Sequence, residues 1–136
     1  MANASDYLED KWARHVLLNQ PYTSPATVYL ALYTSNPTDA DVGTEVAGGL
    51  GYARQLVAPS VWSFVGTPFF LWQNTTTPIT FGPATGSWGT VTHIGFRDAA
   101  SGGNLLIHAP VSPTVAVTAN QLVTFLNGTA LIVQVL

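Results

Sequence analysis

The sequence predicts a mainly β fold, an antiparallel β-sandwich of jelly-roll type with one amphipathic helix at its N-terminal end. Three observations lead to this prediction. Short apolar runs recur at roughly eight to twelve residues, clusters of Gly, Pro, Asn and Asp separate these runs, and a helical period is confined to the start of the chain. With 136 residues and no internal repeat, the chain fits a single domain, residues 1–136, with the helix in residues 1–20 and the sandwich in residues 26–136.

Composition limits the classes of function. Charged residues make up 8% of the chain and hydrophobic residues 47%, whereas charged residues are roughly a quarter of an ordinary soluble domain. The formal net charge of −3 argues against nucleic acid as a partner. No apolar run approaches the roughly 18 residues of a membrane span, and the first residues lack a signal-peptide pattern. We therefore expect a soluble, unexported protein without a membrane partner, whose sparsely charged surface is covered by other protein.

The N-terminal segment has the pattern of an amphipathic helix. Asn3 or Ser5 can cap it, acidic residues follow in the first turn, and Pro21 lies just beyond its expected end near Leu18. The helical period brings one apolar stripe together, formed by Leu8, Trp12 and Val16. We expect this stripe to pack on the protein's own sheet or on a neighbouring subunit.

The clearest strand pattern is Val28–Tyr33, which alternates and is apolar or aromatic on both faces. Both faces should therefore be covered, either by a second sheet and a helix or by a neighbouring subunit. A long turn-rich loop, Asn36–Gly51, follows it. Residues 97–103 form the best hairpin turn. Further strands are expected at 52–58, 79–81, 90–96, 104–109, 111–117, 122–126 and 129–136.

Aromatic side chains are crowded into the segment Val61–Trp72, which holds more aromatic mass than one strand can bury. A hairpin buried at an interface would accommodate them. Trp88, in a glycine-rich loop, suits either packing or a sugar-stacking platform. The predicted interface residues are Leu8, Trp12, Val16, Val61, Trp62, Phe64, Phe69, Phe70, Trp72 and Trp88.

Three carboxylates, Asp39, Asp41 and Glu45, lie in the long loop and suggest a calcium site. The pattern fails for an EF-hand, because Gly43 and Leu50 stand where its fifth and twelfth positions require oxygen ligands. A solvated acidic turn is the simpler interpretation.

The remaining polar residues give no pattern of catalysis. His93 and His108 lie on the two arms of the predicted hairpin and should be neighbours, but no metal-ligand spacing accompanies them. The segment TGSWG has Thr85 where a nucleophile elbow requires glycine. We therefore expect a protein that is not an enzyme and holds no cofactor or metal.

Several blocks of sequence resemble one family in order and spacing. These blocks are ALYTSNPTDADVGTEV, GYARQ and FGPATGSWGTVTHIGFRDAASGGNLL. They resemble short virion proteins of tailed bacteriophages that are labelled tail fibre or head decoration proteins. The resemblance covers most of Ala31–Leu106 and the N-terminal helix. At Val61–Trp72 the chain is bulkier than the polar, glycine- and serine-rich stretch of the family.

The resemblance implies a structural role in the virion. We expect a capsid decoration (cement) protein that binds and stabilises the head shell, with the major capsid protein or other virion proteins as partners and a homo-oligomer, a trimer, as the assembled form. The alternative in the same particle is a small tail or head-fibre subunit. The alternative from another class is a glycan-binding module that uses Trp88. The expected location is the outer surface of the capsid or the tail, after assembly in the host cytoplasm.

Overall fold

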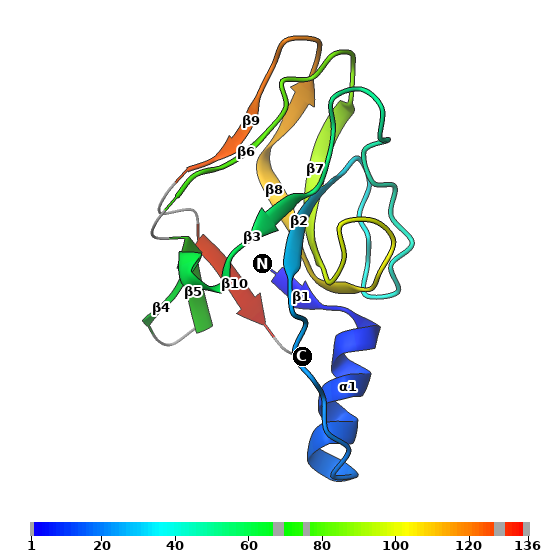
Figure 1. Ribbon diagram of the computed structural model, residues 1–136, viewed down its shortest axis with the longest axis vertical. Coiled ribbons are helices and arrows are strands. Elements are labelled where there is room, and N and C mark those ends of the chain that lie inside the picture. Colours follow the sequence, from blue (N-terminus) through cyan, green and yellow to red (C-terminus); the bar gives the residue numbers. More distant parts are fainter. Residues whose placement is uncertain (1, 67–69, 75–76, 127–129, 135–136) are drawn as a thin grey trace.

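The structure is a computed structural model that describes residues 2–66, 70–74, 77–126 and 130–134, with the side chains of 61–76 and 127–134 outside this description (Figure 1). These described residues form one α-helix, one 3₁₀ turn and ten strands. Their bounds are β1 Ala2–Ala4, α1 Asp6–Leu17, β2 Val28–Tyr33, β3 Gln55–Val57, η1 Pro59–Val61, β4 Trp62–Gly66, β5 Phe70–Asn74, β6 Ile79–Phe81, β7 Gly89–Arg97, β8 Leu105–Val117, β9 Val123–Phe125 and β10 Ala130–Gln134. The prediction of a mainly β fold with one N-terminal helix is confirmed.

The strands form two sheets. The larger has the order β3-β2-β7-β8-β1-β10-β5-β4, and the smaller pairs β6 with β9. Neighbouring strands are antiparallel except β1 and β10, which are parallel. The short strand β1 joins the two halves of the large sheet, because Asn3 pairs with His108 of β8 on one side and with Gln134 of β10 on the other.

The main core lies between the small sheet and the β2-β7-β8 part of the large sheet. Phe81 and Val123 from the small sheet belong to the same buried cluster as Leu32, Val91 and Val117 from the large one. This arrangement explains the alternating pattern of these strands, since every second residue faces the partner sheet. The two packed sheets correspond to the predicted sandwich.

Strand β2 is buried on both faces, as its sequence predicts. Leu30 and Leu32 lie in the main core, and the alternate residues Ala31 and Tyr33 are fully buried as well. The face that carries Tyr33 meets the long loop after β2, because Arg97 donates to the Tyr33 hydroxyl and also binds Asp41 of that loop. A loop therefore takes the role that we expected of a helix or a neighbouring subunit.

The helix begins where the sequence predicts. Ser5 is the N-cap and its hydroxyl accepts a hydrogen bond from the Leu8 amide, while Leu18 is the C-cap. The Ser5 hydroxyl also donates to the carbonyl of Leu105 at 2.5 Å, which ties the start of the helix to β8. From this attachment α1 projects away from the sheets (Figure 1).

The prediction of two separate strands at 104–109 and 111–117 is wrong, because β8 runs through both without interruption. Its Pro110 and Pro113 are tolerated for a structural reason. On the side of β1, strand β8 pairs only at Ile107 and His108 within the described residues, so Pro110 lies beyond that pairing. Pro113 lies in a shift of register against β7, between Pro110 opposite His93 and Val115 opposite Val91, where a strand tolerates a residue without an N–H donor. Of the expected strand 52–58, only Gln55–Val57 pairs as β3.

Candidate interaction surfaces

The long loop Asn36–Gly51 is fastened to the body by three acid–base pairs. Asp39 Oδ1 lies 2.8 Å from His108 Nε2, Asp41 pairs with Arg97 Nη2, and Glu45 Oε2 lies 2.7 Å from Arg54 Nη2. The interpretation of these carboxylates as a solvated acidic turn is therefore wrong. They do not converge on a cation site either, because each of them binds a different base, and the described residues contain no group of three or more potential metal ligands.

Glu45 and Arg54 are the most enclosed of these pairs. Arg54 Nε and Nη2 donate to the two carboxylate oxygens of Glu45 at 2.8 and 2.7 Å, and Nη1 donates to the carbonyls of Ala99 and Gly102, both at 2.7 Å. The Tyr52 hydroxyl donates to Glu45 Oε1 at 2.8 Å and accepts from the Leu32 amide. The network thus joins the loop, β2 and the β7–β8 turn.

This environment sets the ionisation of its members. Burial raises the pKa of the Tyr52 hydroxyl, so it stays a donor. Burial alone would also raise the pKa of Glu45, but the hydrogen bonds from Arg54 and Tyr52 outweigh it and hold the pKa of this carboxyl below its usual value. Glu45 is therefore a carboxylate at neutral pH, and its pair with Arg54 is neutral overall.

Arg97 makes the second buried anchor. Its Nε donates to the Tyr33 hydroxyl at 2.7 Å, its Nη1 donates to the Gly103 carbonyl at 3.1 Å, and its Nη2 binds Asp41. Gly95, two residues earlier on β7, leaves room for the Tyr33 ring, because a Cβ at this position would lie 2.7 Å from that ring. The packing of the loop over β2 and β7 therefore requires glycine here.

His93 and His108 lie on the two paired strands of the hairpin, as predicted. His108 is 5% exposed and is bound to Asp39 rather than to His93. Burial, with a smaller effect of His108, lowers the pKa of His93, whose Nδ1 lies 2.9 Å from the Thr92 hydroxyl. Both histidines are thus engaged in hydrogen bonds of the hairpin and its loop.

The predicted stripe of α1 is only partly covered. Leu8 is 5% exposed and, with Trp12 and Tyr22, packs in a small cluster that includes Ala4 and Leu106. Val16, by contrast, is 76% exposed, and it is followed by Leu17 at 78% and Leu18 at 59%. We call Val16–Leu18 the helix tip. The first half of the stripe packs on the protein's own sheet, and the helix tip lies in the open.

The aromatic segment forms the hairpin that its sequence predicts. Strands β4 and β5 pair antiparallel, with Phe64 opposite Trp72, and β5 pairs with β10, with Trp72 opposite Leu131. This three-stranded part adjoins the rest of the sheet through β1. The side chains of the predicted interface residues Val61, Trp62, Phe64, Phe70 and Trp72 lie outside the described part of the structure, and Phe69 lies outside the described residues altogether, so their burial at an interface stays a prediction.

Trp88 lies in the core. It is 5% exposed, its Nε1 donates to the Leu50 carbonyl at 2.7 Å, and its ring meets that of Tyr52 edge-on with 5.6 Å between the centroids. Of the two alternatives for Trp88, the structure shows packing, in the core of the subunit. The expectation of a sugar-stacking platform or an interface residue is not met, because the indole is enclosed by its own chain.

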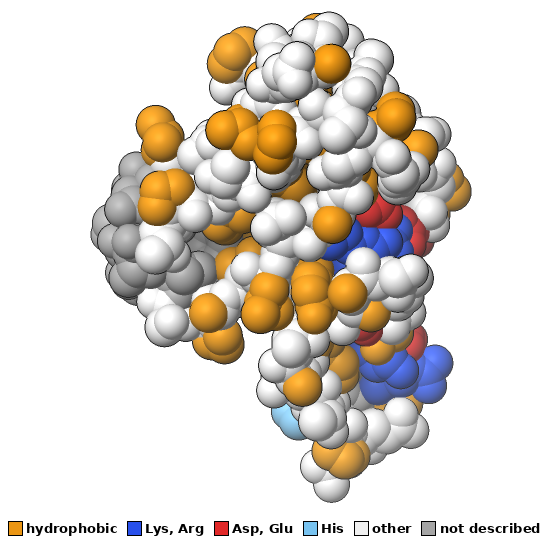
Figure 2. Space-filling model, turned by 45° about the horizontal axis from the view of Figure 1, so that its top comes forward, with side chains coloured by type: hydrophobic (Ala, Val, Ile, Leu, Met, Phe, Trp, Pro, Cys, Tyr) orange, Lys and Arg blue, Asp and Glu red, His pale blue; other side chains and the backbone are white. Residues whose placement is uncertain are grey.

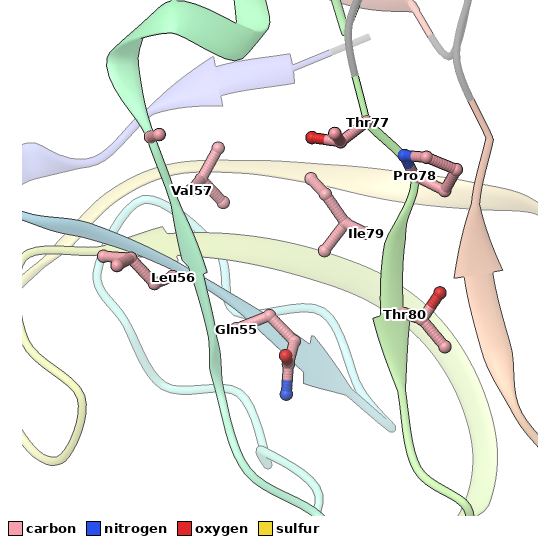
Figure 3. A pocket seen from close by; sticks show the side chains of 8 residues that line it. Gln55, Leu56, Val57, Thr77, Pro78, Ile79 and Thr80 are labelled. Atoms are coloured by element: carbon pink, nitrogen blue, oxygen red, sulfur yellow. The ribbon is translucent and has the colours of Figure 1, made fainter.

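The surface itself carries little charge. Figure 2 shows one face, on which apolar side chains are scattered over most of the surface and acidic and basic groups adjoin each other in small areas. A shallow groove of about 170 Å³ separates β3 from the start of β6 and is lined by uncharged residues (Figure 3). Val57 and Ile79, both buried, extend toward each other between the two strands, and Leu56 is 58% exposed.

Comparison with known proteins identifies one family. Residues 3–133 match the family model described as "Podophage GP4 fiber I protein gp80". No curated protein matches the chain. None of the helices in the described part of the chain has the length and apolar character needed to cross a membrane.

Proposed function

The chain belongs to the podophage GP4 fiber I protein gp80 family, and from this premise we propose that it is a subunit of a virion fibre complex that acts by binding neighbouring virion proteins and has no catalytic role. Family membership makes it a structural protein of a bacteriophage virion. The placement within the fibre complex is our proposal, supported by the description of the family as a fibre protein.

The exposed helix tip is the main support for the proposal that the subunit binds neighbouring virion proteins. Val16, Leu17 and Leu18 are consecutive, apolar and more than half exposed, at the end of a helix whose other half is docked on the sheet. Exposed apolar groups that adjoin one another are typical of a protein contact. Three side chains cannot supply the roughly 800 Å² per partner of a stable interface, so the helix tip would be one of several contacts.

The β4–β5 hairpin is our candidate for a second contact. Its sequence carries Trp62, Phe64, Phe70 and Trp72 on a three-stranded part of the sheet at the opposite edge from β3. We propose that this hairpin is buried between chains of a homo-oligomer, with a trimer as the expected form. A mainly apolar contact is weakly screened by salt, so moderate salt should not release the protein from particles.

Capsid decoration is the competing placement within the virion. A sparsely charged domain with exposed apolar groups would suit a contact on the head shell equally well. The family description favours a fibre, and therefore we place the fibre complex first. A label on the protein in intact particles separates the two, because decoration predicts density over the shell, whereas a fibre subunit predicts density at discrete fibre positions.

The contact surfaces are tested by incorporation into particles. Leu17→Asp and Phe70→Asp should each reduce the amount of protein per particle, because both place a charge in a proposed apolar contact. Thr114→Asp, at an exposed position of β8, is the matched control and should incorporate normally. The amount is measured by quantitative mass spectrometry of purified particles. Normal incorporation of both test variants would contradict the proposed contacts.

A further inference from the structure

A second surface feature lies next to the Glu45–Arg54 pair. It is an open depression with a volume of about 380 Å³, within the usual range of roughly 300–1,000 Å³ for small-molecule sites. The long loop and the β7–β8 turn form its two walls. The lining residues are Glu45, Val46, Gly48, Tyr52, Ala53, Arg54, Ala100 and Ser101.

The two charged residues of the lining neutralise each other. The Arg54 side chain is 8% exposed and the Glu45 side chain 23% exposed, and they are joined by two parallel hydrogen bonds. An added ligand charge would find no free counter-charge in this lining and would lose hydration on binding. The depression therefore favours an uncharged ligand.

The pair still has hydrogen-bonding capacity. Of the five guanidinium N–H groups, Arg54 uses Nε–H, both N–H groups of Nη1 and one of Nη2 within the described residues, which leaves one N–H on Nη2. Glu45 Oε2 accepts from Arg54 alone among these residues and keeps a further lone pair. A donor and an acceptor thus lie side by side on groups that are already held rigid by other contacts.

The residues around the Glu45–Arg54 pair have small side chains. Gly48, Ala53 and Ala100 have little or no side chain, Ser101 carries an exposed hydroxyl, and a Cβ added at Gly48 would meet no atom within 4 Å. The depression therefore leaves room for a ligand ring beside Gly48. Backbone carbonyl and amide groups of exposed loop residues add further hydrogen-bonding partners.

We propose that this depression binds an uncharged saccharide, in which one hydroxyl group donates to Glu45 Oε2 and the adjacent hydroxyl group accepts from Arg54 Nη2. A vicinal diol matches this acceptor and this donor, which lie side by side on the ion pair. A ligand with a single polar group could bind only one of them. Saccharide binding at this depression would not depend on where in the virion the subunit lies.

The test uses the whole chain and a panel of neutral methyl glycosides of glucose, galactose, mannose, rhamnose and N-acetylglucosamine. Saturation-transfer NMR should detect at least one of them with a dissociation constant in roughly the millimolar range. In an amide spectrum that sugar should shift the signals of Gly48, Ala100 and Ser101.

Gly48→Trp is the blocking variant, because its backbone is not in the left-handed region and its Cβ has open space. It should fold normally and weaken sugar binding at least tenfold. Thr114→Trp, exposed on β8 in the half of the hairpin that lies away from the β7–β8 turn, is the control and should bind like the native protein. Arg54 is not varied here, because its loss would also loosen the loop.

Three results would overturn the proposal. The first is that none of the five glycosides binds. The second is binding that Gly48→Trp leaves unchanged, which would place the sugar elsewhere. The third is a preference for N-acetylneuraminic acid over the neutral sugars, which would contradict the neutrality of the site.

Discussion

Replacing Arg54 with methionine removes the guanidinium group and retains a side chain of similar length. The substitution deletes four hydrogen bonds, two to Glu45 and two to the carbonyls of Ala99 and Gly102. Removing one partner of a buried pair costs about 3–5 kcal/mol of unfolding free energy. Because the Glu45 side chain is 23% exposed and regains some water, we expect about 2–4 kcal/mol here.

The assay is urea or thermal unfolding at neutral pH. A loss of this size lowers the melting temperature by roughly 3–5 °C for each kcal/mol in a chain of this length. Arg14→Met is the matched control. Arg14 pairs with Asp10 on the exposed helix surface, where both side chains are about half exposed, and its loss should change stability little. Equal effects of Arg54→Met and Arg14→Met would refute the assignment of Arg54 as the anchor of the loop.

The pH dependence gives a second test of the same pair. The pKa of Glu45 is lowered in the folded state by Arg54 and Tyr52, against the opposing effect of burial. A carboxyl of this kind stabilises the fold above its unfolded pKa of about 4.3, and the contribution is lost as the pH falls through the lower folded value. The difference between the native protein and Arg54→Met should therefore shrink as the pH falls from 7 to about 3. A difference that stays constant over this range would contradict the linkage.

Three further outcomes follow from the core and the loop. Trp88→Ala should cost about 3–5 kcal/mol in urea unfolding, because the indole is 5% exposed, and an unchanged midpoint would contradict its place in the core. Gly95→Ala should lower the melting temperature, because its Cβ would lie 2.7 Å from the Tyr33 ring, whereas Gly48→Ala, which meets nothing within 4 Å, should not. Calorimetry with calcium should show no saturable binding, and tight binding that Asp41→Asn abolishes would show that the loop is a cation site.

The local patterns of the sequence predicted most of the fold. The bounds of β2 and β6 agree with the alternating runs that predicted them, and the turn between β7 and β8 agrees with its Asp, Ser and Gly residues. Strand β1 had no recognisable pattern, because the alternation of Ala2–Ala4 is only three residues long and the strand pairs with strands that are distant in the sequence. Long-range pairing of a three-residue strand leaves no local signal.

The sequence did not predict the anchors of the loop. The three carboxylates stood out in the sequence, but their partners did not, because Asp39 and His108 are 69 positions apart and Asp41 and Arg97 are 56 apart. Neither composition nor spacing along the sequence shows which base each of these acids binds.

The interactions of the few cationic side chains within the subunit affect how the protein can associate with other proteins. Arg54 and Arg97 are buried in anchors of the loop, Arg14 pairs within α1, and Lys11 lies over the Tyr7 ring at 5.3 Å from its centroid. The four fixed cations are thus engaged inside the subunit, which leaves little charge to steer it toward a partner over long distances. Contacts of such a surface depend on shape and apolar area, whose strength varies little with salt. The exposed helix tip fits this mode of association, because it offers apolar groups at the end of a helix held clear of the charged anchors.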